Sequence, residues 1–195
     1  LALLLAMHTQ LVSNKDEHMG KSFYNFVHDR DKNRHIDIMG IVNLTDDSYF
    51  ARSRCLDIGQ AMERVRQMIA EGATIIDVGA CSTRPGAKPV GSQEEWRRLA
   101  PVLEAIRRTC PDVRISVDTY LSEIVSRTYD LIGDFIVNDI SAGEDDPEML
   151  KTAGMLGLPY VAMHKRGTPA VMQTLTDYAD VVDEVAAYFR LFEEK

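Results

Sequence analysis

The stretch IDIMGIV (residues 36–42) is a short apolar run that leads directly into the polar segment NLTDDSYF (residues 43–50). Four more short runs rich in β-branched residues follow along the chain, at 73–78, 113–117, 135–137 and 159–163. Such runs are typical of parallel strands that are buried on both faces. We therefore expect five parallel strands, the first of them within residues 36–42.

Helical patterns separate these runs. Asp57 is predicted to cap a helix that ends at Gly72, and the pair Ser92 and Glu95 has the spacing of a capping box at the start of the next helix. Pro101 predicts a kink or a new start inside that second helix. Further helices are expected over 120–132, from Pro147 onwards, and over 174–194.

Strands that alternate with helices, without hairpin signals, predict a parallel α/β sheet. Two architectures satisfy this pattern, a doubly wound open sheet and a (β/α)8 barrel. The glycine pattern of a dinucleotide-binding domain does not follow the first run, which disfavours the nucleotide-binding form of the open sheet. In both architectures ligands bind at the carboxyl ends of the strands, so the residues after each run are the candidates for a site.

The composition is that of one globular unit. The chain has 195 residues, of which 45% are hydrophobic, and its formal net charge of −8 argues against nucleic-acid binding. Three cysteines without metal-ligand spacing indicate free thiols in a reducing, cytoplasmic compartment. The apolar residues 1–7 are too short to cross a membrane, and we expect residues 1–35 to be an N-terminal extension of a domain at 36–195.

Polar side chains follow every expected strand. Asn43 follows the first, Asp118 the third and Asn138 the fourth, and helix capping or turn formation explains each of them equally well when it is taken alone. Asp77 lies inside its strand, where a buried structural network is the better interpretation. His164, after the fifth strand, is interpreted as an orienting or packing residue rather than a proton shuttle.

The loop after the second run is more specific. It reads Ser-Thr-Arg-Pro-Gly over residues 82–86, and it combines two hydroxyls, a guanidinium and a glycine that lets backbone approach a ligand. Arginine binds phosphate oxygens through a planar fork of N–H donors. In an acidic protein, Arg84 at a strand end therefore indicates an anion contact.

Five segments, taken together and in order, resemble the signatures of the dihydropteroate synthase family. They are IMGIVNLTDDS (38–48), IDVGACSTRPGA (76–87), ISVDTY (115–120), VNDISAG (137–143) and MHKRGTPAVMQ (163–173). Five ordered motifs are far more specific than any single one. The resemblance implies a (β/α)8 TIM barrel of the pterin-binding type. It also implies an enzyme that joins 6-hydroxymethyl-7,8-dihydropterin pyrophosphate to p-aminobenzoate, releasing pyrophosphate and 7,8-dihydropteroate.

The family's site residues carry over by position. Asp118 and Asn138 are implied to hydrogen-bond the pterin ring, with Ile140 and Met163 packing against it. Asn43 is implied to lie near the pyrophosphate and its Mg2+ cofactor. The other implied substrate contacts are Thr83 and Arg84 beside the anion or p-aminobenzoate, Pro85 in the second loop, and Thr45, Asp47 and Ser48 in the mobile first loop.

The implied chemistry assigns catalytic roles to Asp118, Arg84 and Asn43. Loss of pyrophosphate leaves a cation at the pterin methylene, which a buried carboxylate such as that of Asp118 favours. Mg2+ and Arg84 stabilise the departing charge. The neutral amine of p-aminobenzoate attacks without a strong base, so no general base is expected.

The chain departs from the family pattern in two loop positions and in length. Asp46 stands in place of the usual proline, and Cys81 in place of the usual glutamate. A full barrel needs about 250 residues. We therefore expect only about the first five βα units here, and no catalysis by these 195 residues alone.

The remaining strands are expected from a longer protein or from another chain, and the full-length form is expected to be a homodimer without membrane partners. Two alternative functions stay open. One is a pterin-binding methyltransferase, which does not need the pyrophosphate loop at 82–86. The other is a non-catalytic pterin-binding homologue.

Overall fold

The computed structural model describes residues 5–7, 37–44, 54–81, 90–167, 171 and 174–195. Within this part, six strands form one sheet in the order β1-β6-β5-β4-β3-β2. The strands are β1 (Leu5–Met7), β2 (Met39–Asn43), β3 (Ile75–Gly79), β4 (Arg114–Asp118), β5 (Ile136–Asp139) and β6 (Tyr160–Ala162). Neighbours from β2 to β6 pair in parallel, whereas β1 pairs with β6 in the antiparallel direction.

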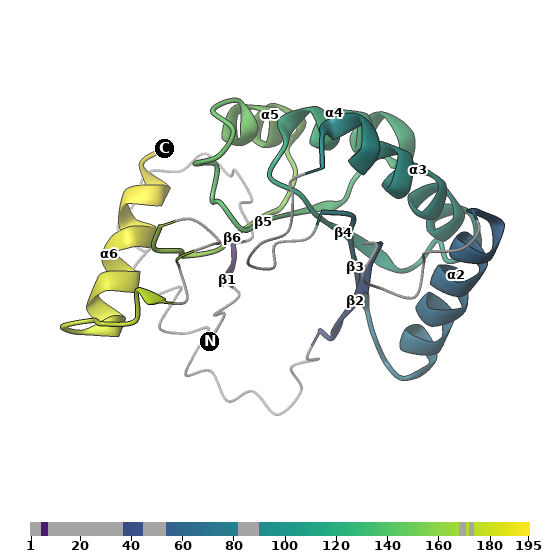
Figure 1. The fold of residues 1–195 in the computed structure, drawn as a ribbon, viewed down its shortest axis with the longest axis horizontal. Helices are drawn as coiled ribbons and strands as arrows, with labels where there is room; N and C mark the ends of the chain where they lie inside the picture. Colours follow the sequence, from purple (N-terminus) through teal and green to yellow (C-terminus); the bar gives the residue numbers. More distant parts are fainter. Residues whose placement is uncertain (1–4, 8–36, 45–53, 82–89, 168–170, 172–173) are drawn as a thin grey trace, which may run out of the picture.

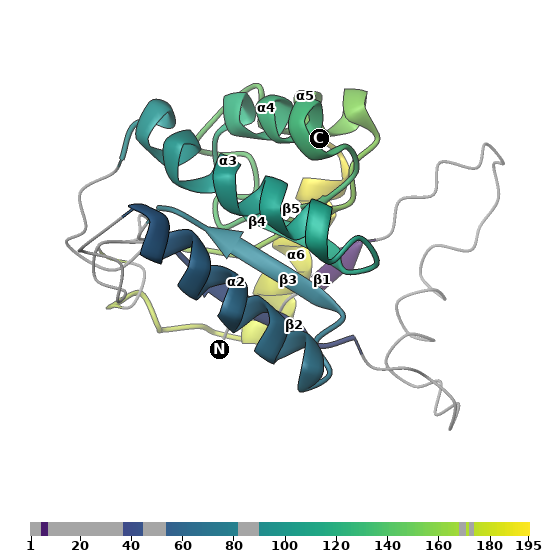
Figure 2. The ribbon, with the colours of Figure 1, turned by 90° about the vertical axis from the view of Figure 1, so that its right-hand side faces the viewer.

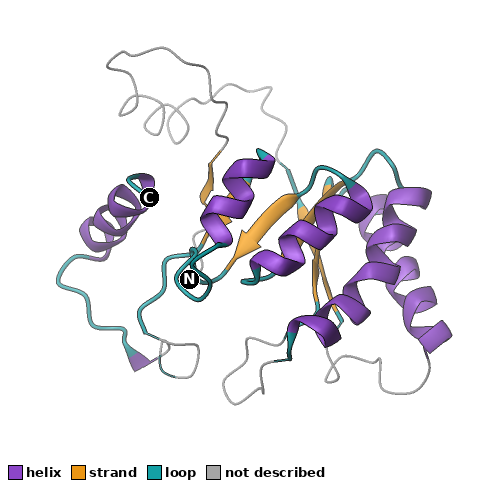
Figure 3. Cartoon of the chain, turned by 90° about the horizontal axis from the view of Figure 1, so that it is seen from above, coloured by secondary structure: helices purple, strands orange, loops and turns teal. Residues whose placement is uncertain are grey.

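A helix follows each of the five parallel strands. The helices are α2 (Arg54–Ala70), α3 (Ser92–Thr109), α4 (Ser122–Ile132), α5 (Met149–Leu156) and α6 (Val181–Glu193). Figure 1 shows α2, α3, α4 and α5 as a continuous outer layer along the curved sheet. Helix α6 lies beside the end of the sheet that carries β6 and β1. Figure 3 shows the same arrangement from above. The five predicted βα units are therefore present in the predicted order.

The main core lies between the strands and this helical layer. Ile76, Val78, Ile115 and Val117 are almost completely buried, and the register pairs Ile76 with Ile115 and Val78 with Val117. Side chains alternate between the two faces of a strand, so these residues all point toward the helices. The residues between them, such as Asp77, point to the opposite face, away from these helices, which we call the inner face of the sheet. Figure 2 shows helices α2 and α3 on one side of the strands.

Several predicted helix boundaries are wrong. Helix α2 begins at Arg54, three residues before the predicted cap at Asp57, and α5 begins at Met149 rather than directly after Pro147. Helix α4 begins at Ser122 instead of residue 120. Helix α6 begins at Val181 instead of residue 174, because the Asp180 carboxylate accepts the amides of the first turn and so ends the preceding non-helical segment.

The predicted capping box at the start of α3 is also wrong. The N-cap residue is Gly91, whose carbonyl accepts the amides of Glu94 and Glu95 at 3.0 and 3.1 Å, and no side chain caps this end. Helix α3 then continues through Pro101 without a new start. Pro101 lies on the exposed side of the helix, and the burial of Leu99 and Leu103 on the other side outweighs the backbone hydrogen bond that a proline removes.

Residues 5–7 form strand β1, although they lie in the expected N-terminal extension, residues 1–35, for which no strand was predicted. Their register pairs Leu5 with Ala162 and Met7 with Tyr160. A three-residue strand is too short to show the alternation of apolar and polar residues by which a strand is recognised in a sequence. Among the described helices, none is both long and apolar enough to cross a membrane.

The helical layer provides the first test of this fold. Leu103 of α3 is fully buried, so the Leu103→Ala variant is expected to lower the free energy of unfolding by about 2–5 kcal/mol. The matched control is Leu191→Ala in α6, whose side chain is 63% exposed and whose change is expected to stay within about 0.5 kcal/mol. Urea denaturation measures both values, and equal losses in the two variants would contradict this packing.

Candidate functional site

Four residues form a row across the carboxyl ends of the parallel strands. The register pairs Asn43 of β2 with Gly79 of β3, Gly79 with Asp118 of β4, and Asp118 with Asn138 of β5. Residues that pair directly across a sheet point to the same face. The row therefore places one carboxylate and two amide groups side by side at one rim of the inner face.

The glycine in this row leaves room for its neighbours. A Cβ atom built on Gly79 would lie 3.2 Å from Oδ2 of Asp118 and 3.4 Å from Oδ1 of Asn43. These side chains thus lean over Gly79 from both sides, and their oxygens converge above it. Gly79 is needed for this close approach rather than for an unusual backbone conformation, since its φ angle is not positive.

Asp77 lies directly beneath the row, and the interpretation of a buried polar network is confirmed. Its side chain is 4% exposed, and its Oδ1 accepts hydrogen bonds from Oγ of Ser116 at 2.6 Å and from Nδ2 of Asn138 at 3.2 Å. Burial raises the pKa of Asp77, although the hydrogen bonds from Ser116 and Asn138 work against this effect. The network ties β3, β4 and β5 together under the rim.

The structural alternative for Asp118, a cap on the next helix, does not hold. The first amide of α4, from Ser122, donates to Oδ2 of Asp146 at 2.7 Å, and the amide of Leu121 donates to the Thr119 hydroxyl at 3.2 Å. Asp146 also accepts the amide of Glu148 at 2.9 Å. Partial burial opposes the effect, but these amides hold the pKa of Asp146 below its usual range. The first amide of α4 is therefore bound by Asp146, whereas Thr119 binds the amide of Leu121 just before the helix.

Asp118 lies in a strongly acidic environment. Burial is the main cause that raises its pKa from 3.8 to about 7, and repulsion from Asp77, Glu95 and Asp139 adds to it. Groups that disfavour a negative charge on Asp118 favour a positive charge on a ligand at the same place. The site can therefore accept N–H donors and stabilise a cationic centre in a bound molecule.

Sequence reasoning missed Glu95 as a member of this environment, because it treated the residue as half of a capping box. Glu95 is fully buried, and neither of its carboxyl oxygens makes a well-formed hydrogen bond within the described part of the chain. Burial raises its pKa, and the nearby Thr119 hydroxyl only partly offsets that effect. The available signal was spacing, since Glu95 lies four residues before Leu99 on the buried stripe of α3.

Sequence reasoning also missed Arg98, which holds two strand ends in place. Its guanidinium lies 3.5 Å from the carbonyl oxygens of Leu44 and Ala80, which directly follow β2 and β3, and 2.7 Å from Glu94. Its side chain is 14% exposed. Arg98 thereby keeps Asn43 and Gly79 at the same level along the rim.

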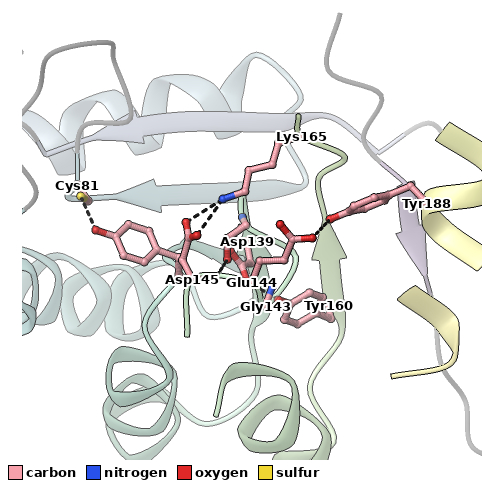
Figure 4. A network of polar contacts seen from close by, with 10 residues as sticks. Cys81, Asp139, Gly143, Glu144, Asp145, Tyr160, Lys165 and Tyr188 are labelled. Atoms are coloured by element: carbon pink, nitrogen blue, oxygen red, sulfur yellow. Dashed lines mark hydrogen bonds and ion pairs between the residues drawn. The ribbon is translucent and has the colours of Figure 1, made fainter. Parts of the chain in front are cut away.

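The loop after β5 is anchored by Asp139, as Figure 4 shows. Its carboxylate accepts the amides of Ser141 and Gly143 at 2.6 and 2.7 Å, and the Tyr160 hydroxyl donates a short hydrogen bond to it. The amide of Met163 donates to the Asp139 carbonyl at 3.2 Å. Ile140 and Met163, the two residues predicted to pack on the pterin ring, therefore flank one buried anchor, and both are half-buried.

Further contacts close the rim near β6. Nζ of Lys165 bonds both oxygens of Asp145 at 2.9 and 3.0 Å, and its side chain is only 4% exposed (Figure 4). His164 meets the Tyr188 ring edge-on, with centroids 4.9 Å apart, in agreement with a packing role.

Cys81, shortly after β3, is a buried free thiol whose Sγ lies 3.8 Å from the Tyr120 hydroxyl.

The structure thus brings Asn43, Asp118 and Asn138 together, with Ile140 and Met163 on the adjoining loops. Their roles as ligand contacts stay predictions. The remaining predicted residues lie outside the described part of the chain: Thr45, Asp46, Asp47, Ser48, Thr83, Arg84 and Pro85. In the part that is described, no group of three or more histidine, cysteine, aspartate or glutamate side chains is arranged to hold a metal ion.

The raised pKa of Asp118 leads to the second prediction. The folded state binds the proton on Asp118 more tightly than the unfolded state does. Ionisation of Asp118 therefore lowers the free energy of unfolding as the pH rises from about 4 to about 7, and this loss reaches its full size above that range. The Asp118→Asn variant is expected to be more stable than the parent above about pH 8, by up to about 4 kcal/mol, but not at about pH 4.

Carbon-13 NMR of the Asp118 carboxyl group measures the titration directly, with an expected midpoint of about 7. The exposed Asp130 on α4 provides the control, because Asp130→Asn is expected to leave the pH dependence of stability unchanged. A midpoint near the ordinary value of 3.8 would show that the acidic environment is absent.

Comparison with known proteins places this chain in a family. Residues 39–195 match the family described as "Pterin binding enzyme". The chain is 49% identical to the mitochondrial folate synthesis bifunctional protein of Arabidopsis thaliana over 155 residues, which cover 77% of this chain and 28% of that protein. It is 43% identical to the dihydropteroate synthase of Escherichia coli over 155 residues, which cover 80% of this chain and 54% of the enzyme.

Solved structures agree with these matches. The dihydropteroate synthase of Yersinia pestis, in a complex with a sulfonamide drug, superposes with a TM-score of 0.72 and 35% identity over 81% of this chain and 56% of that one. The prediction of a (β/α)8 barrel of the pterin-binding type, represented by five βα units, is confirmed. The chain spans about half the length of the bacterial synthases it matches. Since the family match covers residues 39–195, this chain belongs to the pterin-binding enzyme family.

Proposed function

We propose that this chain supplies the pterin-binding part of a dihydropteroate synthase, a transferase of folate biosynthesis. The reaction joins 6-hydroxymethyl-7,8-dihydropterin pyrophosphate to p-aminobenzoate and releases pyrophosphate and 7,8-dihydropteroate. The observation that carries the proposal is the row Asn43, Gly79, Asp118 and Asn138, which spans four strands and gathers polar side chains from three of them at one rim. The similarity to dihydropteroate synthases supports the choice of reaction.

Asp118 and Asn138 are proposed to bind the pterin ring. The edge of a pterin carries N–H donors, which a carboxylate and an amide oxygen can accept together. Binding such donors favours the ionised form of Asp118 and so lowers its pKa from about 7. The affinity for a pterin is therefore expected to rise as the pH rises through neutrality.

The acidic surroundings of Asp118 suit the proposed chemistry. When pyrophosphate leaves, positive charge develops at the pterin methylene group, and fixed negative groups in a site with little water stabilise such a charge. Burial and the neighbouring carboxyl groups of Asp77, Glu95 and Asp139 have raised the free energy of the anion on Asp118 before any ligand binds. A cationic centre relieves that repulsion, so the site binds the transition state more strongly than the substrate, whose pterin methylene group carries no charge.

Mg2+ is proposed as the cofactor, with Asn43 as its ligand from the described residues. Mg2+ prefers oxygen ligands and is usually held by one or two protein groups together with substrate phosphates. The amide oxygen of Asn43, which leans over Gly79, has the required chemistry. The ion would neutralise charge on the departing pyrophosphate. Thr83 and Arg84 are proposed as further contacts to the pyrophosphate or p-aminobenzoate.

Further properties of the whole enzyme stay predictions. We expect sulfonamides to compete with p-aminobenzoate, which the sulfonamide complex of the Yersinia pestis enzyme supports by analogy. A homodimeric full-length form and a cytoplasmic location are expected as well, although two plant relatives carry the description mitochondrial.

Titration calorimetry with 6-hydroxymethyl-7,8-dihydropterin pyrophosphate, with and without Mg2+, tests the proposed function. We expect binding that Mg2+ strengthens, and we expect Asp118→Asn to weaken it by at least about tenfold, because a hydrogen bond to a charged group is lost. Asp130→Asn, at an exposed position on α4, is the matched control and is expected to bind as the parent does.

The same experiment separates the alternatives. Equal affinity for the dihydropterin with and without its pyrophosphate group would argue for a pterin-binding methyltransferase. Binding of both substrates by the complete protein, without formation of 7,8-dihydropteroate, would argue for a non-catalytic homologue.

A substitution at Gly79 tests the geometry of the row. The added methyl group of Gly79→Ala meets Oδ2 of Asp118 at 3.2 Å and Oδ1 of Asn43 at 3.4 Å, so the Asp118 side chain must move and the dihydropterin affinity is expected to fall by at least about fivefold. The control is Gly59→Ala on the exposed side of α2, where an added Cβ meets no atom within 4 Å and affinity is expected to stay unchanged. Unchanged binding in Gly79→Ala would contradict the placement of the ligand at this rim.

A further inference from the structure

We propose that Asp77 is a positioning residue that orients the side-chain amide of Asn138 and thereby selects the hydrogen-bonding edge of the heterocycle. This inference rests on the proposed pterin-binding function. Asp77 has no place in the row itself, because it lies one layer below the rim and is almost completely buried. It acts on a ligand only through the residue above it.

The contacts of Asp77 determine the orientation of the amide. Its Oδ1 already accepts the hydroxyl of Ser116 at 2.6 Å, and it accepts Nδ2 of Asn138 at 3.2 Å. This oxygen is an acceptor when the carboxyl group is ionised, and also when the proton sits on the other oxygen. In both states the NH2 group of Asn138 points down toward Asp77, so its carbonyl oxygen points away from Asp77.

This orientation has a consequence for recognition. An asparagine amide without such a partner presents its oxygen or its NH2 group to a ligand with similar ease. With Asp77 in place, Asn138 offers an acceptor next to the carboxylate of Asp118, its direct neighbour across the β4–β5 pair. Two adjacent acceptors select a heterocycle whose edge carries two N–H donors, and they reject one that presents an oxygen at the same position.

Asp77 also influences Asp118 directly. After burial, repulsion from Asp77 is the largest cause that raises the pKa of Asp118. A residue with neither a charge nor an acceptor oxygen at position 77, such as leucine, is therefore expected to change two properties at once: the orientation of the Asn138 amide and the titration of Asp118. Ser116 provides a matched control, because it bonds the same oxygen of Asp77 at the same depth.

The binding experiment compares two probes that differ at one position. 6-Hydroxymethylpterin carries an amino group at carbon 2, whereas 6-hydroxymethyllumazine carries an oxygen there. We expect the unchanged chain and Ser116→Ala to prefer the pterin by at least about tenfold, and Asp77→Leu, which removes both acceptor oxygens, to reduce this preference to about twofold or less. Retention of the full preference by Asp77→Leu overturns the proposal.

A second experiment needs no ligand and no variant that might fail to fold. In NMR spectra of the unchanged chain, the side-chain NH2 protons of Asn138 are expected to exchange slowly with solvent, because one of them is bonded to buried Asp77. Rapid exchange of both protons overturns the proposal.

Where Asp77→Leu folds, as circular dichroism will show, the Asp118 midpoint is expected to fall by at least about half a pH unit, with no such change in Ser116→Ala. An unchanged midpoint in Asp77→Leu counts against the proposal. If the unchanged chain binds neither probe, the proposed function fails. The ligand-free exchange and titration results then decide the role of Asp77 separately.

Discussion

The register of the parallel strands is the constraint on which the site depends. Direct pairing places Asn43, Gly79, Asp118 and Asn138 in one row, although the first and the last are 95 positions apart in sequence. A slip of one residue at any pair would turn that residue toward the helices instead. The register is held by the opposite face, where Val78 and Val117 are completely buried under the helical layer. Apolar burial on one face thus decides the polar arrangement on the other.

The same arrangement explains why a carboxyl group at the rim is difficult to ionise. Asp118 lies close to Asp77, Glu95 and Asp139, and each of these raises the free energy of its anion in addition to the effect of burial. A core built only for stability would not gather acids in this way, since buried carboxylates without cations cost free energy. This free-energy cost fits a site that binds N–H donors and a developing positive charge, because both reduce the repulsion among the carboxyl groups.

The loops around the rim are anchored by side chains from other elements. Asp139 binds the amides of its own loop and the hydroxyl of Tyr160 (Figure 4). Asp146, from the same loop, accepts the amide of Ser122 at the start of helix α4. Lys165 and Asp145 join the loops after β6 and β5. These contacts allow Ile140 and Met163 to remain near the row while the surrounding segments have little regular structure.

The sequence by itself determined the five parallel strands, the alternation with helices and the rim that carries the polar residues. These features depend on local properties, namely β-branched runs, apolar stripes and polar residues at strand ends. It also placed Asp77 in a buried network, because a charged residue inside a buried strand requires partners. The helix starts were less predictable, since backbone groups such as the Gly91 carbonyl and side chains from elsewhere, such as Asp146, replaced the expected caps.

Only the tertiary structure decided which polar residues meet and what they do to one another. The spacing of Glu95 suggested a cap, whereas the packing of α3 buries it beside Asp118. The contact between Asp77 and Asn138 joins residues 61 positions apart in sequence and follows from the pairing of β3, β4 and β5. Cross-strand distances and burial are collective properties of the packed sheet, so no local pattern in the chain encodes the pKa of Asp118 or the orientation of an amide.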